Sequence, residues 1–291
     1  MAVESAPVPE QPGSPAKPRP PRRLLAALIA LGALAATYRY LIRPVSLWRQ
    51  AGRRERPEHT LLGALPAKTS GGETLSVELR KYASHIVAEV TPLSQLSDEE
   101  GEDLCLEQLA AYVDGDNLRR RKGPLARLAP RWASRNQGPE VIARTAPVRM
   151  EMGAFSNPPH LQGVDIAVAY APQTLATVSL TMPSEYKALI DLPLPSDRNV
   201  SLRAVPEYYA AAAGFKGLPP TPGRVREVHT AILEALFHAG LEPQSGRGVM
   251  VYQYHDHPAI PGFLRWNEVV LYLEAKGVED AAQRDPEEEE A

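Results

Sequence analysis

The chain has 291 residues, of which 44% are hydrophobic and 23% charged, and these are ordinary values for a protein that buries a core. This composition excludes a wholly disordered chain and a multispanning membrane protein. A single cysteine, Cys105, excludes an intramolecular disulfide, a cysteine-based zinc site and an iron–sulfur cluster, and it fits a reducing compartment.

Charge is distributed unevenly along the chain. The first 60 residues carry ten Lys or Arg against four Asp or Glu, whereas the remainder carries 22 against 31 and ends in an acidic run. Because the larger part of the protein is acidic, it would repel a phosphate backbone, and we expect no nucleic-acid partner.

The N-terminal region contains a proline-rich tail and an apolar run. Residues 1–23 hold seven prolines and almost no apolar bulk, which predicts a disordered tail. Residues 24–38 carry no charge, and as a helix the 19 residues of 24–42 would span roughly 28 Å. We therefore expect a single transmembrane helix over residues 24–42 that contacts membrane lipid. A cleaved signal or transit peptide and a buried core helix are the alternatives.

The basic residues that flank this run predict its orientation. Six arginines follow residue 38 up to residue 56, and four basic residues precede residue 24. The positive-inside bias therefore favours a single-pass membrane protein whose C-terminal domain is cytoplasmic. Residues 43–72 are expected to form a basic linker.

A globular domain is expected over residues 73–275, followed by an acidic disordered tail over 276–291. Capping patterns predict two long helices, one opening at 97–100 and ending at Gly115, the other opening at Thr221 and ending at Gly240. Strand patterns at 77–90, 249–254 and 268–273 lie around them. This order predicts an α+β fold, a distorted β-barrel of two similar halves with two long helices packed on it.

Motifs for nucleotide, hydrolase or metalloprotease chemistry are absent from the sequence, so no catalytic or metal site is predicted. His255 and His257 alternate as metal or haem ligands on a strand would, but a polar turn before Pro258 is the favoured explanation of this cluster. Glu268 beside Asn267 could perform acid–base chemistry with Tyr254, or it could belong to a structural network.

Six short motifs, in order and at compatible spacing, resemble those of the SOUL haem-binding protein family. They are RKYASHIVAEV at 80–90, YVDGDN at 112–117, RTAPV at 144–148, LTMP to LPLP at 180–195, FKG at 215–217, and the segment 254–269 with PGFLRWNEV. The resemblance implies a distorted α+β barrel with two helices. It also implies non-enzymatic binding of haem or another tetrapyrrole in an apolar groove, for buffering or transport.

The same resemblance implies a set of ligand-binding residues on the first long helix and on the loop before the last strand. These are Leu106, Leu109, Ala110 and Val113 on the helix, and Ile260, Phe263 and Arg265 on the loop. The apolar residues would cover the macrocycle, and Arg265 would pair with a propionate. His85 and His255 are the candidate axial ligands of a haem iron.

Two other functions remain open at this point. The same groove in a membrane-tethered interaction module would bind a peptide or a lipid. An enzyme that uses Glu268 is the third reading.

Overall fold

The computed structural model describes residues 22–92, 98–118, 139–152, 175–245, 247–255 and 259–282. The predicted tail up to residue 21, residues 119–138, His257 and the final nine residues are among the parts of the chain that lie outside these ranges. The chain divides into two compact units, Met1–Pro44 and Val45–Ala291, and we describe each by itself.

The first unit is helical in its described part. Helix α1 (Arg22–Thr37) continues as a π-helix over Tyr38–Ile42, and α2 (Arg43–Gly52) begins at the boundary with the second unit. Among the helices of the described ranges, none is long and apolar enough to cross a membrane. The predicted transmembrane helix over 24–42 is therefore not supported.

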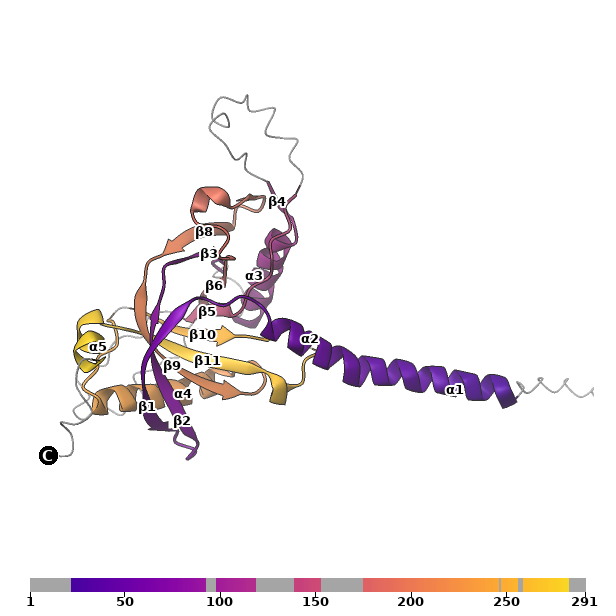
Figure 1. Cartoon of the computed structure of the whole chain (residues 1–291), viewed down its shortest axis with the longest axis horizontal. Helices are drawn as coiled ribbons and strands as arrows, with labels where there is room; N and C mark the ends of the chain where they lie inside the picture. Colours follow the sequence, from indigo (N-terminus) through magenta and orange to yellow (C-terminus); the bar gives the residue numbers. More distant parts are fainter. Residues whose placement is uncertain are drawn as a thin grey trace, which may run out of the picture. The chain divides into compact units, whose positions relative to one another are not determined.

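The second unit is built on one large antiparallel sheet (Figure 1). Its strands are β1 (His59–Lys68), β2 (Thr74–Tyr82), β3 (His85–Val90), β5 (Val148–Met152), β6 (Leu175–Thr181), β8 (Val200–Val205), β9 (Tyr208–Lys216), β10 (Val249–Gln253) and β11 (Trp266–Leu273). The order across the sheet is β1-β2-β9-β11-β10-β5-β6-β3-β8, and β4 (Asn117–Leu118) pairs separately with β7 (Leu194–Pro195).

The prediction of an α+β fold is confirmed, but the prediction of a barrel is wrong. Strands β1 and β8 are the two edges of the sheet, each bonded to a single neighbour among the described strands. A barrel needs its first and last strands to pair, and here no such ladder closes the sheet.

Two halves of similar element order build this sheet. One contains β2, β3, α3 (Asp98–Val113), β5 and β6, and the other contains β8, β9, α4 (Pro222–His238), β10 and β11. The first strand of each half pairs with the second strand of the other, β2 with β9 and β8 with β3, while β5 and β10 join the halves at the centre. The halves are thus interlocked through exchanged strands.

Helices α3 and α4 cover one face of the sheet. As predicted, Thr221 caps α4: its side chain accepts a hydrogen bond from the Arg224 N–H at 3.3 Å, and Pro222 is the first residue of the helix. The apolar side chains of α4 from Val225 to Leu236 are buried in the main hydrophobic core together with Leu109 and Val113 of α3.

The opposite face of the sheet is rich in tyrosine, and we call it the tyrosine face. It carries Tyr82, Tyr208, Tyr252, Tyr254 and Tyr272. Alternation along each strand separates the two faces: on β9, Ala211 and Ala213 pack with the helices, whereas Ala210 and Ala212 pack with the tyrosines.

Two predicted connecting segments are structured. The expected linker over 43–72 contains α2 and the edge strand β1. Helix α5 (Ala275–Ala282) occupies the start of the expected acidic tail, where Val278 is buried in the main core.

Candidate functional site: a basic pocket beside a buried ion pair

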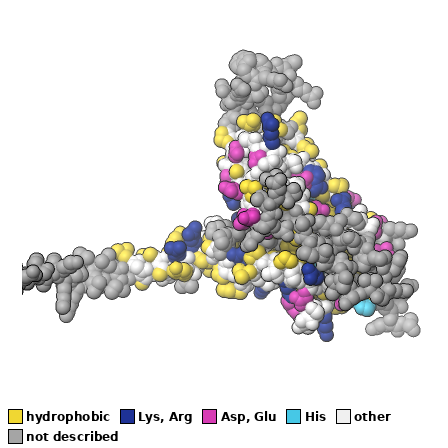
Figure 2. All heavy atoms as spheres, turned by 180° about the vertical axis from the view of Figure 1, so that it is seen from behind, with side chains coloured by type: hydrophobic (Ala, Val, Ile, Leu, Met, Phe, Trp, Pro, Cys, Tyr) yellow, Lys and Arg dark blue, Asp and Glu magenta, His cyan; other side chains and the backbone are white. Residues whose placement is uncertain are grey.

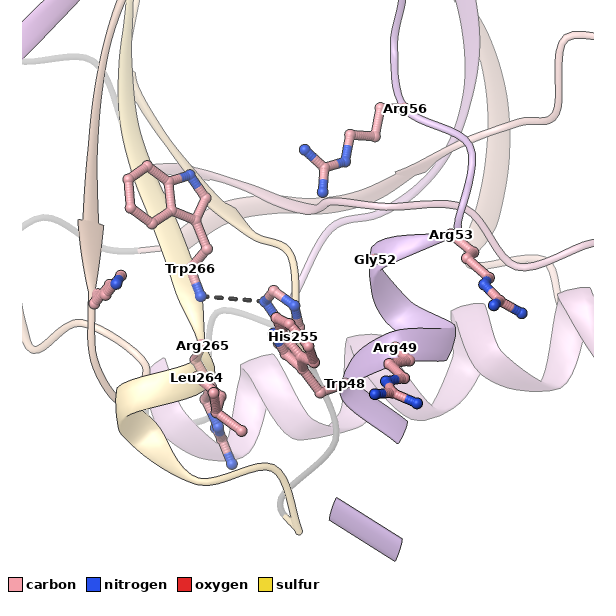
Figure 3. A pocket seen from close by; sticks show the side chains of 10 residues that line it. Trp48, Arg49, Gly52, Arg53, Arg56, His255, Leu264, Arg265 and Trp266 are labelled. Carbon is pink, nitrogen blue, oxygen red and sulfur yellow. Dashed lines mark hydrogen bonds between the residues drawn. The ribbon is translucent and has the colours of Figure 1, made fainter. Parts of the chain in front are cut away.

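A pocket of about 540 Å³ lies where α2 meets the ends of β9, β10 and β11 (Figure 3). We call it the basic pocket. It is lined by Trp48, Arg49, Gly52, Arg53, Arg56, Lys216, His255, Leu264, Arg265 and Trp266. All of these residues belong to the second unit.

The lining combines positive charge with aromatic surface. Four arginines and one lysine line the pocket, and no Asp or Glu is among its described lining residues. Arg49 lies on the last turn of α2, and Arg53 directly follows the last residue of that helix. Trp48, Trp266 and Leu264 supply the apolar walls. Such a lining suits an amphipathic ligand that carries carboxylate or other anionic groups.

The side chain of Trp266 is positioned by packing on β9 and by a hydrogen bond within β11. On β9, a Cβ atom added to Gly214 would lie only 2.1 Å from the indole ring, so the ring occupies space that only a glycine leaves. The indole Nε1–H donates to Glu268 Oε1 at 3.2 Å. The orientation of this pocket wall is therefore set by β9 and β11 together.

The backbone of Trp266 orients the imidazole ring of His255. The Trp266 N–H donates to His255 Nδ1 at 3.1 Å (Figure 3). Since Nδ1 accepts, the neutral imidazole carries its proton on Nε2. Iron coordination through Nε2 would require the loss of that proton, whereas hydrogen-bond donation to an anion would not.

Arg265 fixes the loop at the mouth of the pocket. Its Nε–H donates to the Ile260 carbonyl at 2.8 Å. This bond spans the turn that leads into the short 3₁₀ helix η5 (Gly262–Leu264). Ile260 is buried beneath the loop, whereas Phe263 is exposed.

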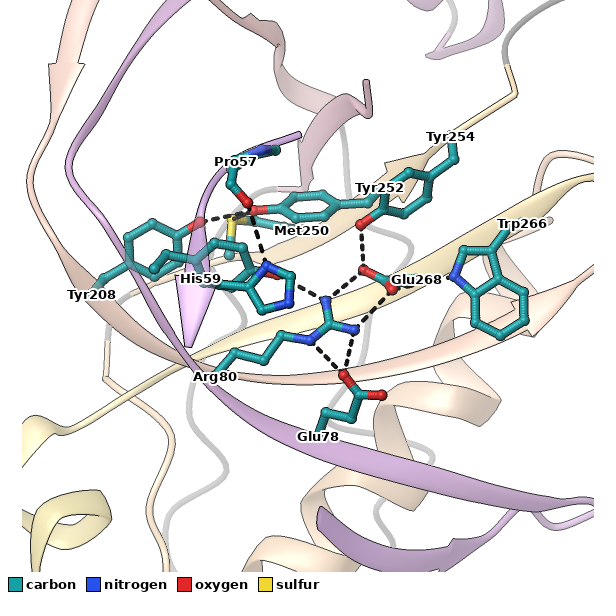
Figure 4. A network of polar contacts seen from close by, with 11 residues as sticks. Pro57, His59, Glu78, Arg80, Tyr208, Met250, Tyr252, Tyr254, Trp266 and Glu268 are labelled. Atoms are coloured by element: carbon teal, nitrogen blue, oxygen red, sulfur yellow. Dashed lines mark hydrogen bonds and ion pairs between the residues drawn. The ribbon is translucent and has the colours of Figure 1, made fainter. Parts of the chain in front are cut away.

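Behind Trp266 lies a buried ion pair (Figure 4). Arg80 on β2 donates from Nη1 and Nη2 to the two carboxylate oxygens of Glu268 on β11, at 2.9 and 3.0 Å. Both residues are buried, with exposed fractions of 6% and 4%. The Tyr254 hydroxyl donates to the same carboxylate at 2.7 Å. The pair therefore bridges β2 and β11 across the intervening β9.

The protonation states of this network favour a structural role. Burial alone raises the pKa of Glu268, but the hydrogen bonds and charge of Arg80 outweigh it, and the net pKa lies below the ordinary value. Burial, and next the charge of Glu268, raise the pKa of Tyr254 well above its ordinary value. At neutral pH the carboxylate accepts and the phenol donates, and neither is poised to exchange a proton.

The α3 residues of the predicted groove lie elsewhere. Leu109 and Val113 are buried in the main core, and Leu106 is half-buried against it. Ala110 is half-buried on the same helix. α3 packs on β3, β6 and β8. Of the predicted binding residues, the structure brings Arg265 and His255 together in the basic pocket.

His85, the other candidate axial ligand, lies at the tyrosine face. Its Nδ1–H donates to the Ala83 carbonyl at 2.9 Å, which leaves the Nε2 lone pair as the acceptor. Its ring centre is 6.0 Å from that of Tyr208. Burial, and further the charges of Arg149 and Arg203, lower its pKa, so the neutral form is favoured. His85 does not line the basic pocket, so the two candidate ligands belong to different places.

Sequence reasoning missed the α2 side of the pocket. Trp48, Arg49 and Arg53 fall in the segment that was predicted to be a linker. One signal was present, since arginines four residues apart next to a tryptophan are typical of a helix with a basic face.

Comparisons with known proteins agree with the motif order in the sequence. The family model described as SOUL heme-binding protein matches residues 54–272. No curated protein matches the chain.

Solved structures resemble the chain only distantly. The EcmrR C-terminal domain is 10% identical, with a TM-score of 0.42 over 69% of this chain and 98% of that one. A hydrolase from Listeria innocua is 11% identical, with a TM-score of 0.37 over 76% and 93%. SAV2435 bound to tetraphenylphosphonium is 9% identical, with a TM-score of 0.33 over 69% and 94%. Because these TM-scores are below 0.5, the three structures support no conclusion about the function of this chain.

Proposed function

Since the chain belongs to the SOUL heme-binding protein family, we propose that it binds haem or a related tetrapyrrole in the basic pocket. The proposed role is non-enzymatic, namely buffering or transport of the ligand. The observation that carries the proposal is the joint presence of five cationic side chains and two tryptophans in one pocket, with no Asp or Glu among the described residues that line it.

The residues present fit the chemistry of such a ligand. A tetrapyrrole offers a flat apolar ring and carboxylate side groups. Trp48, Trp266 and Leu264 would cover the ring, and Arg49 and Arg53 would pair with the carboxylates. The volume of about 540 Å³ lies within the range of roughly 300–1,000 Å³ that is common for small-molecule sites.

The ring and its carboxylates, rather than the iron, are the expected points of recognition. His255 has its proton on Nε2 when neutral, and the other lining residues include no Cys, Met or Tyr. The proposal therefore covers metal-free tetrapyrroles as well as haem. Bound haem would add a redox-active iron to the pocket.

A hemin titration followed by absorbance tests this function. We expect saturable binding by the full chain, and a dissociation constant at least tenfold higher in Arg49→Glu/Arg53→Glu, because both pocket cations become repulsive. Arg198→Glu/Arg226→Glu is the matched control, since both arginines are exposed and neither lines the pocket. No saturable binding, or equal weakening in both variants, would refute the proposal.

One further variant separates the basic pocket from the groove that was predicted on α3. Leu106 is half-buried on α3 and does not line the basic pocket. Leu106→Glu is therefore expected to leave hemin affinity unchanged. A large loss of affinity in this variant, with folding intact, would indicate that hemin binds at α3 and not in the basic pocket.

We also propose that residues 24–42 attach the protein to a membrane, with the C-terminal unit on the cytoplasmic side. The uncharged run and the exposure of Leu31 and Leu34 support attachment, and Figure 2 shows hydrophobic side chains on the surface of the described part of this helical segment. The excess of arginines after the run supports the orientation. Leu31→Lys/Leu34→Lys is expected to reduce flotation of the full chain with neutral vesicles, and unchanged flotation would contradict attachment.

A further inference from the structure

Large apolar side chains are exposed at the rim of the basic pocket. Phe263 is 73% exposed and directly precedes the lining residue Leu264. Leu218 is 65% exposed, and its side chain lies against Gly262, where an added Cβ would be 3.2 Å from it. Phe263 and Leu218 therefore lie on the same side of the mouth, and we call them the apolar rim.

The α2 side of the mouth has the same character. Val45 is exposed three residues before Trp48, which is itself exposed at the edge of the pocket. Residues three apart lie on one face of a helix. Figure 3 shows Trp48 and Arg49 on α2 facing Leu264 and Arg265 across the pocket. Apolar side chains thus flank the cations on both sides.

All charged side chains among the described residues that line the basic pocket are positive. The five cationic lining residues have no acidic neighbour in the described lining. Glu55 is close in sequence, but its carboxylate accepts the Ser184 N–H at 2.8 Å and is engaged there. A cationic surface bordered by exposed Phe, Leu and Trp has the composition of surfaces that bind at the headgroup level of a bilayer.

We propose that the apolar rim and the basic pocket dock on the surface of an anionic lipid bilayer. The rim side chains enter the interface, and the cations lie against anionic headgroups. Docking on the bilayer does not depend on the proposed tetrapyrrole binding. If that function holds as well, the pocket mouth faces the phase in which an amphipathic tetrapyrrole dissolves, and the ligand exchanges without crossing bulk water.

Vesicle binding by the full chain tests the docking. Flotation is measured with phosphatidylcholine vesicles and with vesicles that also contain phosphatidylserine. Wild type is expected to bind the anionic vesicles more tightly, and added salt is expected to remove the difference. Leu218→Ser/Phe263→Ser should lower the affinity for anionic vesicles at least tenfold. The matched control is Ile190→Ser/Phe237→Ser, in which two similarly exposed apolar residues outside the pocket lining are changed.

The outcomes separate docking from ligand binding. Equal affinity of wild type for both vesicle types, or equal loss in rim and control variants, overturns the docking proposal. Leu218→Ser alone should leave the hemin titration without vesicles unchanged, because Leu218 does not line the pocket. Rim-dependent vesicle binding without saturable hemin binding would retain docking and remove the proposed function.

Discussion

His229 should make the stability of the second unit strongly dependent on pH. It lies on α4 with only 2% of its surface exposed, and this burial lowers its pKa to about 4 from the ordinary 6.5. The unfolded chain therefore takes up a proton near pH 6.5, while the folded protein resists protonation down to about pH 4. The stability contribution is fully present above pH 6.5 and is lost as the pH falls toward 4.

The magnitude follows from the size of the shift. A shift of about 2.5 pKa units corresponds to about 3 kcal/mol, of which about 2.5 kcal/mol is already lost at pH 4.5. This is a large fraction of the roughly 5–15 kcal/mol that stabilises a typical domain.

Urea unfolding at pH 7.5 and at pH 4.5 checks this value. His229→Gln removes the titrating group, so the variant should lose about 2.5 kcal/mol less than wild type between the two pH values. His238→Gln is the control, because it makes the same substitution at an exposed position of the same helix. Identical pH dependence in wild type and His229→Gln would refute the reasoning.

Further predictions concern the Arg80–Glu268 ion pair, the packing of the Trp266 indole on Gly214 and the N-cap of α4. Glu268→Gln removes one of the two carboxylates that pair with the buried Arg80, and only the more exposed Glu78 remains, so the change should cost about 1–3 kcal/mol in urea unfolding; an unchanged midpoint would contradict a structural pair. Gly214→Ala should cost about 1–3 kcal/mol through overpacking and should shift the tryptophan emission, and an unaltered spectrum would show that the Trp266 indole had not moved. Thr221→Ala should cost about 1 kcal/mol, measured in the same way, and no change would argue against the cap.

Local signals predicted the helices well but not the closure of the sheet. Thr221 and Gly240 act within a few residues of the helix ends, so the sequence alone locates α4. The continuous apolar run along β9 indicates that both faces of the strand are buried, but it does not identify the neighbouring strands. The edge strand β1 was missed because it contains Gly63 and Pro66 and is largely exposed. Whether β1 meets β8 is decided by the curvature of the whole sheet.

The candidate site was predicted in part for a similar reason. The apolar spacing of Leu109 and Val113 indicates a buried helix face, but spacing alone cannot separate a core from a ligand groove. Arg265 and His255 were singled out as candidates, and the structure places both in one pocket. Their partner element, α2, comes from a segment more than 200 residues earlier in the chain, and no local pattern connects the two.

The exchange of strands between the two halves has a consequence for synthesis. β2 is made early, yet its partner β9 follows only after α3 and the six described strands β3 to β8, and Arg80 meets Glu268 across 188 positions. At roughly 5–20 residues per second, the ribosome delivers Tyr208 on the order of ten seconds after Tyr82. During this interval the first half has neither of its exchanged neighbours, and apolar strands are exposed with open edges. The nascent chain therefore depends on protection from aggregation until translation is nearly complete, and a fragment that ends before β9 has no route to this sheet.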